Sequence, residues 1–442
     1  MPGAKTDARR AVAMATLGCK LNQFESEAIL TRFREAGYDV TDEVEAADVC
    51  VVNTCAVTAT AESKARALLR SMHRRNPRAV LMAVGCMAER APQALAAMDG
   101  VSAVLGNREK EHILDFLPVA RTTEAPAVFV GETRAATGFD DNVAVSGLLG
   151  RTRCFLKVQD GCSQKCTYCI IPQLRGRGRS LEIPRVVEQA QALAERGFAE
   201  LVITGVALGT YGSDLGFDHG LVDLLAALSF ASGLRRIRLG SVEPWAVTED
   251  LIEVMAASRT ICPHLHIPLQ SADDSVLHRM NRRYTMSQIS RVFEHAFRWR
   301  DDWGFGSDII VGFPSEGREQ FENTCRFLAD SPLSYLHVFP FSARPGTPAS
   351  RLPERIGDSE KKERASRLRV LDGELRARFR RAHLGKCVPV LFEKRYAGSL
   401  LAGHAANYLD VFAAADESLA GTIQDVMITQ LHPAGVVGEV AI

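Results

Sequence analysis

The stretch Gly161–Ser180, GCSQKCTYCIIPQLRGRGRS, holds three cysteines in the spacing C-x3-C-x2-C: Cys162, Cys166 and Cys169. Three thiolates this close on one short loop can hold one metal cluster, whereas a structural zinc site usually takes two pairs of ligands. A cubane iron–sulfur cluster normally takes four cysteine ligands, so three cysteines leave one iron open to a small molecule. The alternatives are a partial zinc site and chance clustering.

The composition is that of a globular protein without a membrane segment. The 442 residues predict two to four domains, and the 46% hydrophobic content suffices for sizeable cores. The formal net charge is zero, so an RNA partner would be held by local patches. No stretch approaches the roughly 18–20 apolar residues of a membrane span, and Ala11–Leu17 is too short for a signal peptide. We expect a cytoplasmic protein whose eleven cysteines include metal ligands rather than forming a disulfide framework.

Residues 9–120 alternate between strand-like and helix-like segments. The predicted strands are 11–16, 48–52, 79–84 and 101–105, and the predicted helices are 23–35, 58–75 and 88–98. This alternation is typical of a doubly wound parallel α/β domain, in which ligands bind at the carboxyl ends of the strands. Cys19, Cys55 and Cys86 each follow a predicted strand, so we expect their thiols to meet at that edge. They indicate a second three-cysteine cluster, with buried core thiols as the alternative.

The central part of the chain predicts a barrel. Residues 121–150 lack a sustained period and are rich in Ala, Gly and Thr, so we expect a linker there. Residues 151–380 repeat a strand and a helix six times, which predicts a partial (β/α)6 parallel barrel. The predicted strands are 154–158, 201–204, 236–239, 264–268, 308–311 and 336–339. In such barrels the chemistry lies on loops after the strands, and the first three-cysteine loop follows the first strand.

The end of the chain changes character twice. Arg351–Arg381 carries 11 basic and 6 acidic residues. Within it, Lys361–Arg381 predicts a basic helix that joins two domains and could follow an RNA backbone. Residues 381–442 hold short β-prone runs separated by turn residues, which predicts a small antiparallel β-barrel. Residues 386–442 carry 3 basic and 6 acidic residues, the opposite of the charge that phosphate binding needs.

Several motifs resemble one enzyme family. TLGCKLNQFESEAI (Thr16–Ile29), VVNTCAVTATAESKAR (Val51–Arg66) and AVGCMAER (Ala83–Arg90) are similar to the N-terminal domain of the methylthiotransferases. The spacing C-x3-C-x-aromatic-C, with Tyr168 as the aromatic residue, resembles the signature of radical S-adenosylmethionine (SAM) enzymes. The sequence around Cys19 resembles that of the branch that modifies N6-threonylcarbamoyladenosine in tRNA. The C-terminal region resembles a TRAM domain.

The resemblance implies two 4Fe-4S clusters and a radical reaction. Cys162, Cys166 and Cys169 would be catalytic ligands of the cluster that binds SAM at its open iron, and Cys19, Cys55 and Cys86 would hold the second cluster. The SAM-derived 5′-deoxyadenosyl radical would act on C2 of the modified adenine next to the anticodon, and the second cluster would hold or donate sulfur. The residues expected to line the SAM site are Tyr168, Thr204, Gly205, Glu243 and Gln270.

The expected partners are tRNA, an electron donor such as a flavodoxin or ferredoxin, and a sulfur source; no membrane partner is expected. Arg175, Arg177 and Arg179 follow the cysteine loop and suit phosphate contact, although a solvated basic loop is an equal alternative.

Two further functions remain open at this stage. The same scaffold could act on isopentenyladenosine in tRNA or on a ribosomal-protein aspartate. A protein of another class, an electron carrier or an RNA-binding protein without catalysis, would not cleave SAM.

Overall fold

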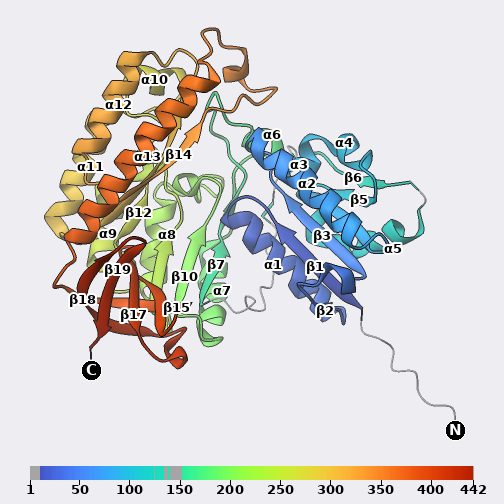
Figure 1. Cartoon of the computed structure of the whole chain (residues 1–442), viewed down its shortest axis with the longest axis horizontal. Coiled ribbons are helices and arrows are strands. Elements are labelled where there is room, and N and C mark those ends of the chain that lie inside the picture. Colours follow the sequence, from blue (N-terminus) through green and yellow to red (C-terminus); the bar gives the residue numbers. More distant parts are fainter. Residues whose placement is uncertain (1–9, 124, 134–137, 140–151, 442) are drawn as a thin grey trace.

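The computed structural model describes residues 10–123, 125–133, 138–139 and 152–441. Figure 1 shows an N-terminal α/β unit, a central unit of strands covered by helices, and a small C-terminal barrel. The expected α/β class is confirmed, and so are the parallel N-terminal sheet, the partial central barrel and the presence of a small C-terminal β-barrel. Within the described residues no helix is both long and apolar enough to cross a membrane.

The N-terminal unit is a six-stranded parallel sheet in the order β2-β1-β3-β4-β5-β6. Its strands are β1 Ala11–Thr16, β2 Asp39–Val40, β3 Val49–Thr54, β4 Val80–Gly85, β5 Val101–Leu105 and β6 Ala127–Phe129. Its α-helices are α1 Lys20–Glu35, α2 Ala59–Arg75, α3 Cys86–Arg90, α4 Pro92–Ala96 and α5 Ile113–Thr122. The side chain of Thr58 caps α2 by accepting a hydrogen bond from the N–H of Ala61 at 3.1 Å.

Two sequence expectations about this unit need correction. The single helix expected at 88–98 is split into α3 and α4, because Pro92 disfavours a helical conformation at Ala91, whose φ is −145°. The stretch 121–150, expected to be a linker, contains the end of α5 and the whole of β6, which pairs in parallel with β5. A strand of three residues is too short to show the alternation of apolar and polar residues that predicts strands. It can be recognised only from its pairing with a neighbouring strand. Residues 124, 134–137 and 140–150 of that stretch lie outside the described residues.

The central unit is the expected partial barrel of six parallel strands. They are β7 Arg153–Lys157, β10 Glu200–Thr204, β11 Arg236–Leu239, β12 His264–His266, β13 Gly304–Val311 and β14 Tyr335–Pro340. They form two three-stranded sheets, β7-β10-β11 and β12-β13-β14, which isolated bridges such as Ser241↔His266 connect. A short antiparallel pair, β8 Gln159–Asp160 with β9 Arg179–Ser180, brackets the cysteine loop.

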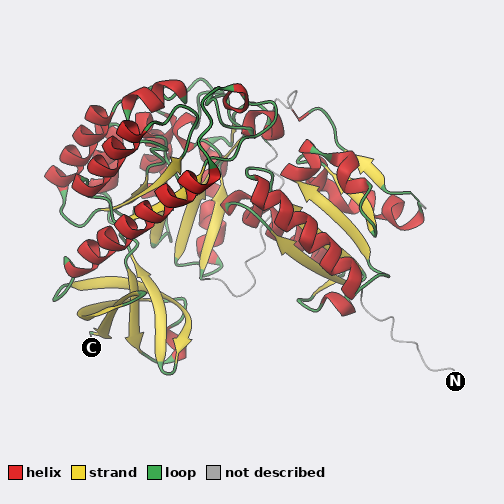
Figure 2. Cartoon of the chain, turned by 45° about the horizontal axis from the view of Figure 1, so that its top comes forward, coloured by secondary structure: helices red, strands yellow, loops and turns green. Residues whose placement is uncertain are grey.

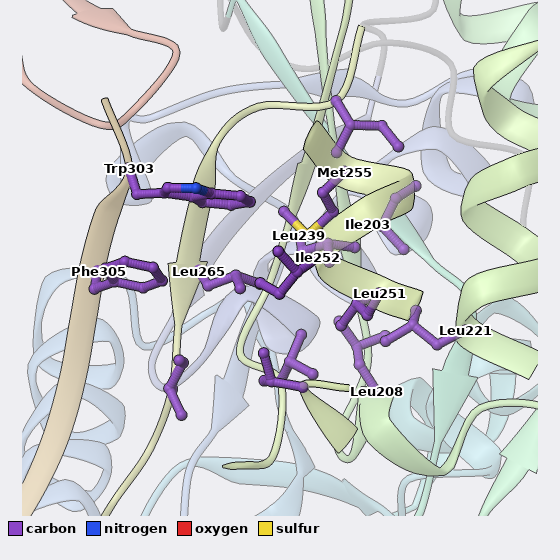
Figure 3. Packing of buried hydrophobic residues seen from close by; sticks show 14 of the residues in the cluster. Ile203, Leu208, Leu221, Leu239, Leu251, Ile252, Met255, Leu265, Trp303 and Phe305 are labelled. Atoms are coloured by element: carbon purple, nitrogen blue, oxygen red, sulfur yellow. The ribbon is translucent and has the colours of Figure 1, made fainter. Parts of the chain in front are cut away.

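Helices cover the outer face of this barrel (Figure 2). They are α7 Ile183–Glu195, α8 Gly220–Ser229, α9 Glu249–Ala257, α10 Asp274–Arg279, α11 Met286–Trp299, α12 Arg318–Asp330 and α13 Asp358–Arg381. The short helix α6 Ile171–Arg175 packs instead against the N-terminal unit, where it contacts α3. Apolar strand residues point to these helices, and Figure 3 shows Leu265 and Phe305 in this core with Ile252 and Met255 of α9. Because side chains alternate along a strand, the remaining residues, many of them charged, face the barrel interior.

The C-terminal unit is a closed barrel of five strands in the order β15-β16-β17-β19-β18. The strands are β15 Cys387–Ala397, β16 Leu400–Ala405, β17 Asp410–Ala414, β18 Ile423–His432 and β19 Gly435–Val440. Apolar side chains, among them Phe392, Val411 and Val426, fill its interior. We expected an antiparallel barrel, but the strands β17 and β19 run parallel to each other. Which strands become neighbours in a closed barrel depends on pairings distant in sequence, which local patterns do not encode.

Candidate functional site: two three-cysteine centres

The first cysteine loop lies at the carboxyl end of the first barrel strand and is held at several points. The N–H of Cys162 donates to the carbonyl of Gly176 at 3.0 Å, and the N–H of Cys169 donates to that of Cys166 at 3.1 Å. Thr167 donates through its N–H to the carbonyl of Met280 and through its hydroxyl to that of Arg279. The loop is therefore fixed by the protein itself.

The three thiols of this loop lie close enough for their charges to interact. Burial raises the pKa of Cys162 to about 11 and that of Cys169 to about 12. Both thiolates need a positive partner, which an iron cluster supplies. Arg282, which the sequence reasoning missed, donates to Cys166 Sγ at 3.7 Å, and both residues line a cavity of about 200 Å³. This donor set fits a three-cysteine iron–sulfur cluster.

Alanine at Gly161, just before the loop, is expected to lower the cluster content. Gly161 has a φ of +68°, and an added Cβ would lie 1.9 Å from the carbonyl oxygen of Arg177. The β8–β9 pair would have to open, which would displace Cys162. Gly197→Ala is the matched control, because its φ is +91° but nothing lies within 4 Å of the added Cβ. Iron per chain after anaerobic reconstitution should fall only in Gly161→Ala; equal iron in both variants would contradict this account.

The residues expected to bind SAM surround the first centre to different degrees. Glu243 lies close enough to Cys162 to influence its charge, and its carboxylate accepts a hydrogen bond from the N–H of Gly209 at 2.8 Å. Burial raises the pKa of Glu243, and it also raises the pKa of Tyr168, which lies near Arg282. Tyr168 directly precedes Cys169 in the chain, and Glu243 is near enough to Cys162 for their charges to interact.

The other three residues follow barrel strands. The carbonyl of Thr204 accepts a hydrogen bond from Val158, and a Cβ added to Gly205 would lie 2.9 Å from that of Gln159. Gln270 has a φ of +69° and is tied through its backbone to β13. None of these three has a contact with the cysteines among the interactions of the described residues, and their roles stay predictions.

The second set of cysteines meets at the carboxyl edge of the N-terminal sheet. Cys19 precedes α1, Cys55 follows β3, and Cys86 begins α3 directly after β4. A Cβ added to Gly18 would lie 3.3 Å from Cys55 Sγ, which shows how closely the two loops approach. The charges of the three thiols influence one another, and burial raises the pKa of Cys55 to about 11. This set also fits a three-cysteine cluster.

Two asparagines that the sequence reasoning missed contact this second centre. Cys19 Sγ donates to the side-chain oxygen of Asn22 at 3.7 Å, and the amide of Asn107 donates to Cys86 Sγ at 3.8 Å. Asn107 also donates to the carbonyl of Leu174 in α6, the short helix that follows Cys169. The helix α6 therefore connects the two centres.

A buried ion-pair network joins the same surfaces. Arg175, at the end of α6, donates to Glu25 of α1 at 2.7 Å and to Asp160 at 3.0 Å. Lys110 binds Glu25 at 2.6 Å, and Lys157 binds Asp160 at 2.8 Å. Burial alone would raise the pKa of both carboxyl groups, but the surrounding cations outweigh it and hold both pKa values well below their usual range.

This network changes the interpretation of the arginines after the cysteine loop. Arg175 has only 2% of its side chain exposed, and Arg179 is buried with its guanidinium donating to the carbonyls of Arg175 and Arg177. Neither guanidinium is available to RNA phosphate, contrary to expectation, whereas Arg177 is exposed. The sequence shows a run of arginines, but it does not show that a carboxylate from a distant helix, Glu25 of α1, folds against them.

Two known families match this chain, one in the N-terminal unit and one in the central unit. The family described as "Uncharacterized protein family UPF0004" matches residues 11–106, and the Radical SAM superfamily matches residues 156–328. The chain is 37% identical to the threonylcarbamoyladenosine tRNA methylthiotransferase MtaB of Bacillus subtilis, over 94% of this chain and 93% of that protein. It is 34% identical to the ribosomal protein uS12 methylthiotransferase RimO of Desulforudis audaxviator, over 97% and 96%.

A solved structure supports the fold. The radical SAM methyltransferase TsrM of Kitasatospora setae superposes with a TM-score of 0.56 at 15% identity, covering 75% of this chain and 73% of that one. Three findings indicate the same family. They are the two family matches, the relatives named as methylthiotransferases that align over more than 90% of this chain, and the two three-cysteine centres. This chain belongs to the radical SAM methylthiotransferases, enzymes whose cofactors are 4Fe-4S clusters and SAM.

Proposed function

We propose that this enzyme adds a methylthio group to C2 of the N6-threonylcarbamoyladenosine next to the anticodon of tRNA. The observation that carries the proposal is the approach of two three-cysteine centres through α6, which suits a reaction that needs both a radical and a sulfur source. The substrate assignment rests on the wording around Cys19 and on the relative from Bacillus subtilis.

The residues of the chain would divide the work as follows. Cys162, Cys166 and Cys169 would hold one cluster, and Cys19, Cys55 and Cys86 the other. With SAM bound, the first cluster would supply the radical chemistry, while the protein would orient the reactants and exclude water. Glu243 and Tyr168 beside the cysteines would help to position SAM, and an unpaired loop base can be turned out into such a site.

RNA would be held by fewer cations than the sequence suggests. Many basic side chains of α13 make internal contacts: Arg364 binds Glu316, Arg367 binds Glu322, and Arg378 donates to the carbonyl of Ala329. The exposed Arg177 remains the candidate for phosphate contact near the first centre. Reduction would come from a flavodoxin or ferredoxin, and a separate sulfur source would supply the second centre.

The test is mass spectrometry of nucleosides from bulk tRNA, with the gene deleted and then restored. We expect 2-methylthio-threonylcarbamoyladenosine to disappear on deletion and to return on complementation. If it persists while the isopentenyladenosine or ribosomal-protein modification disappears, the substrate assignment is wrong. If no modification changes, the catalytic proposal itself fails.

A further inference from the structure

Three side chains of metal-binding type lie together on the inner face of the central barrel. His266 lies on β12, Asp308 on β13 and His337 on β14, which are three neighbouring parallel strands. The strand register places Asp308 directly beside His337. Chain neighbours such as Leu265 and Ile309 belong to the apolar core beneath the helices. Because side chains alternate along a strand, the three polar side chains face the barrel interior.

The donor atoms of these side chains converge on one spot. His266 Nε2 lies 2.9 Å from Asp308 Oδ1, and His337 Nδ1 lies 3.1 Å from the same oxygen. One ligand atom of each side chain lies within 4.8 Å of those of the other two. Ligand atoms at about 2.0–2.1 Å from a tetrahedral ion are roughly 3.3–3.4 Å apart, so a small adjustment of the side chains makes room for one ion.

The donor types select a class of metal. Two imidazoles and one carboxylate are the protein ligands of many catalytic zinc sites and of non-haem iron sites, and both kinds of site keep a position open for a further ligand. Calcium and magnesium prefer oxygen ligands alone. Two neutral imidazoles and one carboxylate leave a divalent ion with a single net positive charge, which suits an oxygen ligand at the open position.

The ring of His266 is held from its other side. Its Nδ1 lies 3.1 Å from the hydroxyl of Tyr335, which in turn lies 3.0 Å from Nε2 of the buried His264. The tyrosine ring lies over Gly306, where an added Cβ would approach it to 2.1 Å. Metal-bound histidines usually have such a polar partner on the second nitrogen, which fixes the orientation and the tautomer of the ring.

The cluster is open to solvent on the side of His337. The exposed fraction of the side chain rises from 7% at His266 to 24% at Asp308 and 52% at His337. An ion can therefore enter, and it would displace the protons that now join the two rings to the carboxylate. We propose that His266, Asp308 and His337 bind a divalent transition-metal ion of the zinc or iron class, separate from both cysteine centres.

The test is zinc binding by the cluster-loaded, full-length enzyme after a brief wash with a chelator. The loaded clusters occupy the cysteines, so zinc does not bind there. We expect one zinc per chain by plasma mass spectrometry. Calorimetric titration should show that Tyr335→Phe, which keeps all three ligands, weakens zinc binding roughly 10- to 100-fold. His337→Asn and Asp308→Asn each remove a ligand and should weaken it by more than about 100-fold. Asparagine at 308 can still accept hydrogen bonds from both rings, so this variant separates a metal site from a hydrogen-bonded cluster.

The matched control is His295→Asn. His295 also lies near two carboxylates, at 3.8 Å from Glu249 and 3.9 Å from Glu253, but these face different ring nitrogens and do not converge on one ion with it. Its replacement should change neither the amount nor the affinity of bound zinc. Thermal unfolding checks the fold of every variant, and iron content shows whether zinc has replaced iron in the clusters.

Three results would refute this metal site. Wild type binds no zinc, zinc appears only as iron is lost, or folded His337→Asn and Asp308→Asn bind zinc as tightly as wild type. If a ligand variant does not fold, equal zinc affinity of Tyr335→Phe and His295→Asn refutes the site in the same way. Zinc binding does not depend on the identity of the substrate, so this inference and the proposed function fail separately.

Discussion

Replacing Cys166 by alanine is expected to abolish SAM cleavage by the reduced enzyme. Cys166 is one of three thiols on the first loop, and two thiolates cannot retain a cubane cluster that normally takes four. The second centre is formed by cysteines on other loops, so about half of the iron should remain bound. Release of 5′-deoxyadenosine under anaerobic reduction, together with iron per chain, measures the effect.

The matched control is Cys387→Ala. Cys387 is an exposed cysteine at the start of β15, far along the chain from both centres, and its replacement should change neither iron content nor SAM cleavage. Cleavage retained by Cys166→Ala at the wild-type rate would refute the assignment of the first cluster. Loss of all iron would show instead that the two centres assemble together.

Replacing Arg175 by methionine is expected to destabilise the contact between the N-terminal and central units by about 3–5 kcal/mol, because removing one partner from a buried ion-pair network leaves uncompensated charge. Glu25 and Asp160 would lose the cation that both share. Urea-induced unfolding at neutral pH, followed by circular dichroism, measures the change.

The pH dependence of this effect has a definite sign. The pKa values of Glu25 and Asp160 in the folded protein are depressed. Their contribution to stability is therefore fully present above the unfolded-state pKa of about 4 and is lost as the pH falls through the folded-state values. The difference between wild type and Arg175→Met should shrink on acidification.

Arg75→Met is the control for the second prediction. Arg75 pairs with Glu45 at 2.7 Å on the surface, where water screens the charges, and its loss should leave the unfolding midpoint unchanged. Equal effects of Arg75→Met and Arg175→Met would contradict the importance of the buried network.

Sequence patterns predicted the elements of this protein well where they are long and periodic. The strands β1 and β5 begin and end at the expected residues. The six barrel strands lie where strand-like runs predicted them, although β12 ends at His266 instead of Pro268 and β13 begins at Gly304 instead of Asp308. The short strands β2 and β6, the barrel strand β16 and the order of the C-terminal barrel were missed. They are defined by pairing partners rather than by their own composition.

The sequence by itself determined where the candidate ligands lie along the chain: two sets of three cysteines, each cysteine or cysteine loop following a predicted strand, where parallel sheets gather their loops. Only the tertiary structure decided what surrounds them. It buries Arg175 against Glu25, 150 residues away, and turns an apparent RNA contact into a structural one. Charge is visible in a sequence, but whether a charge is paired depends on which segments fold against it.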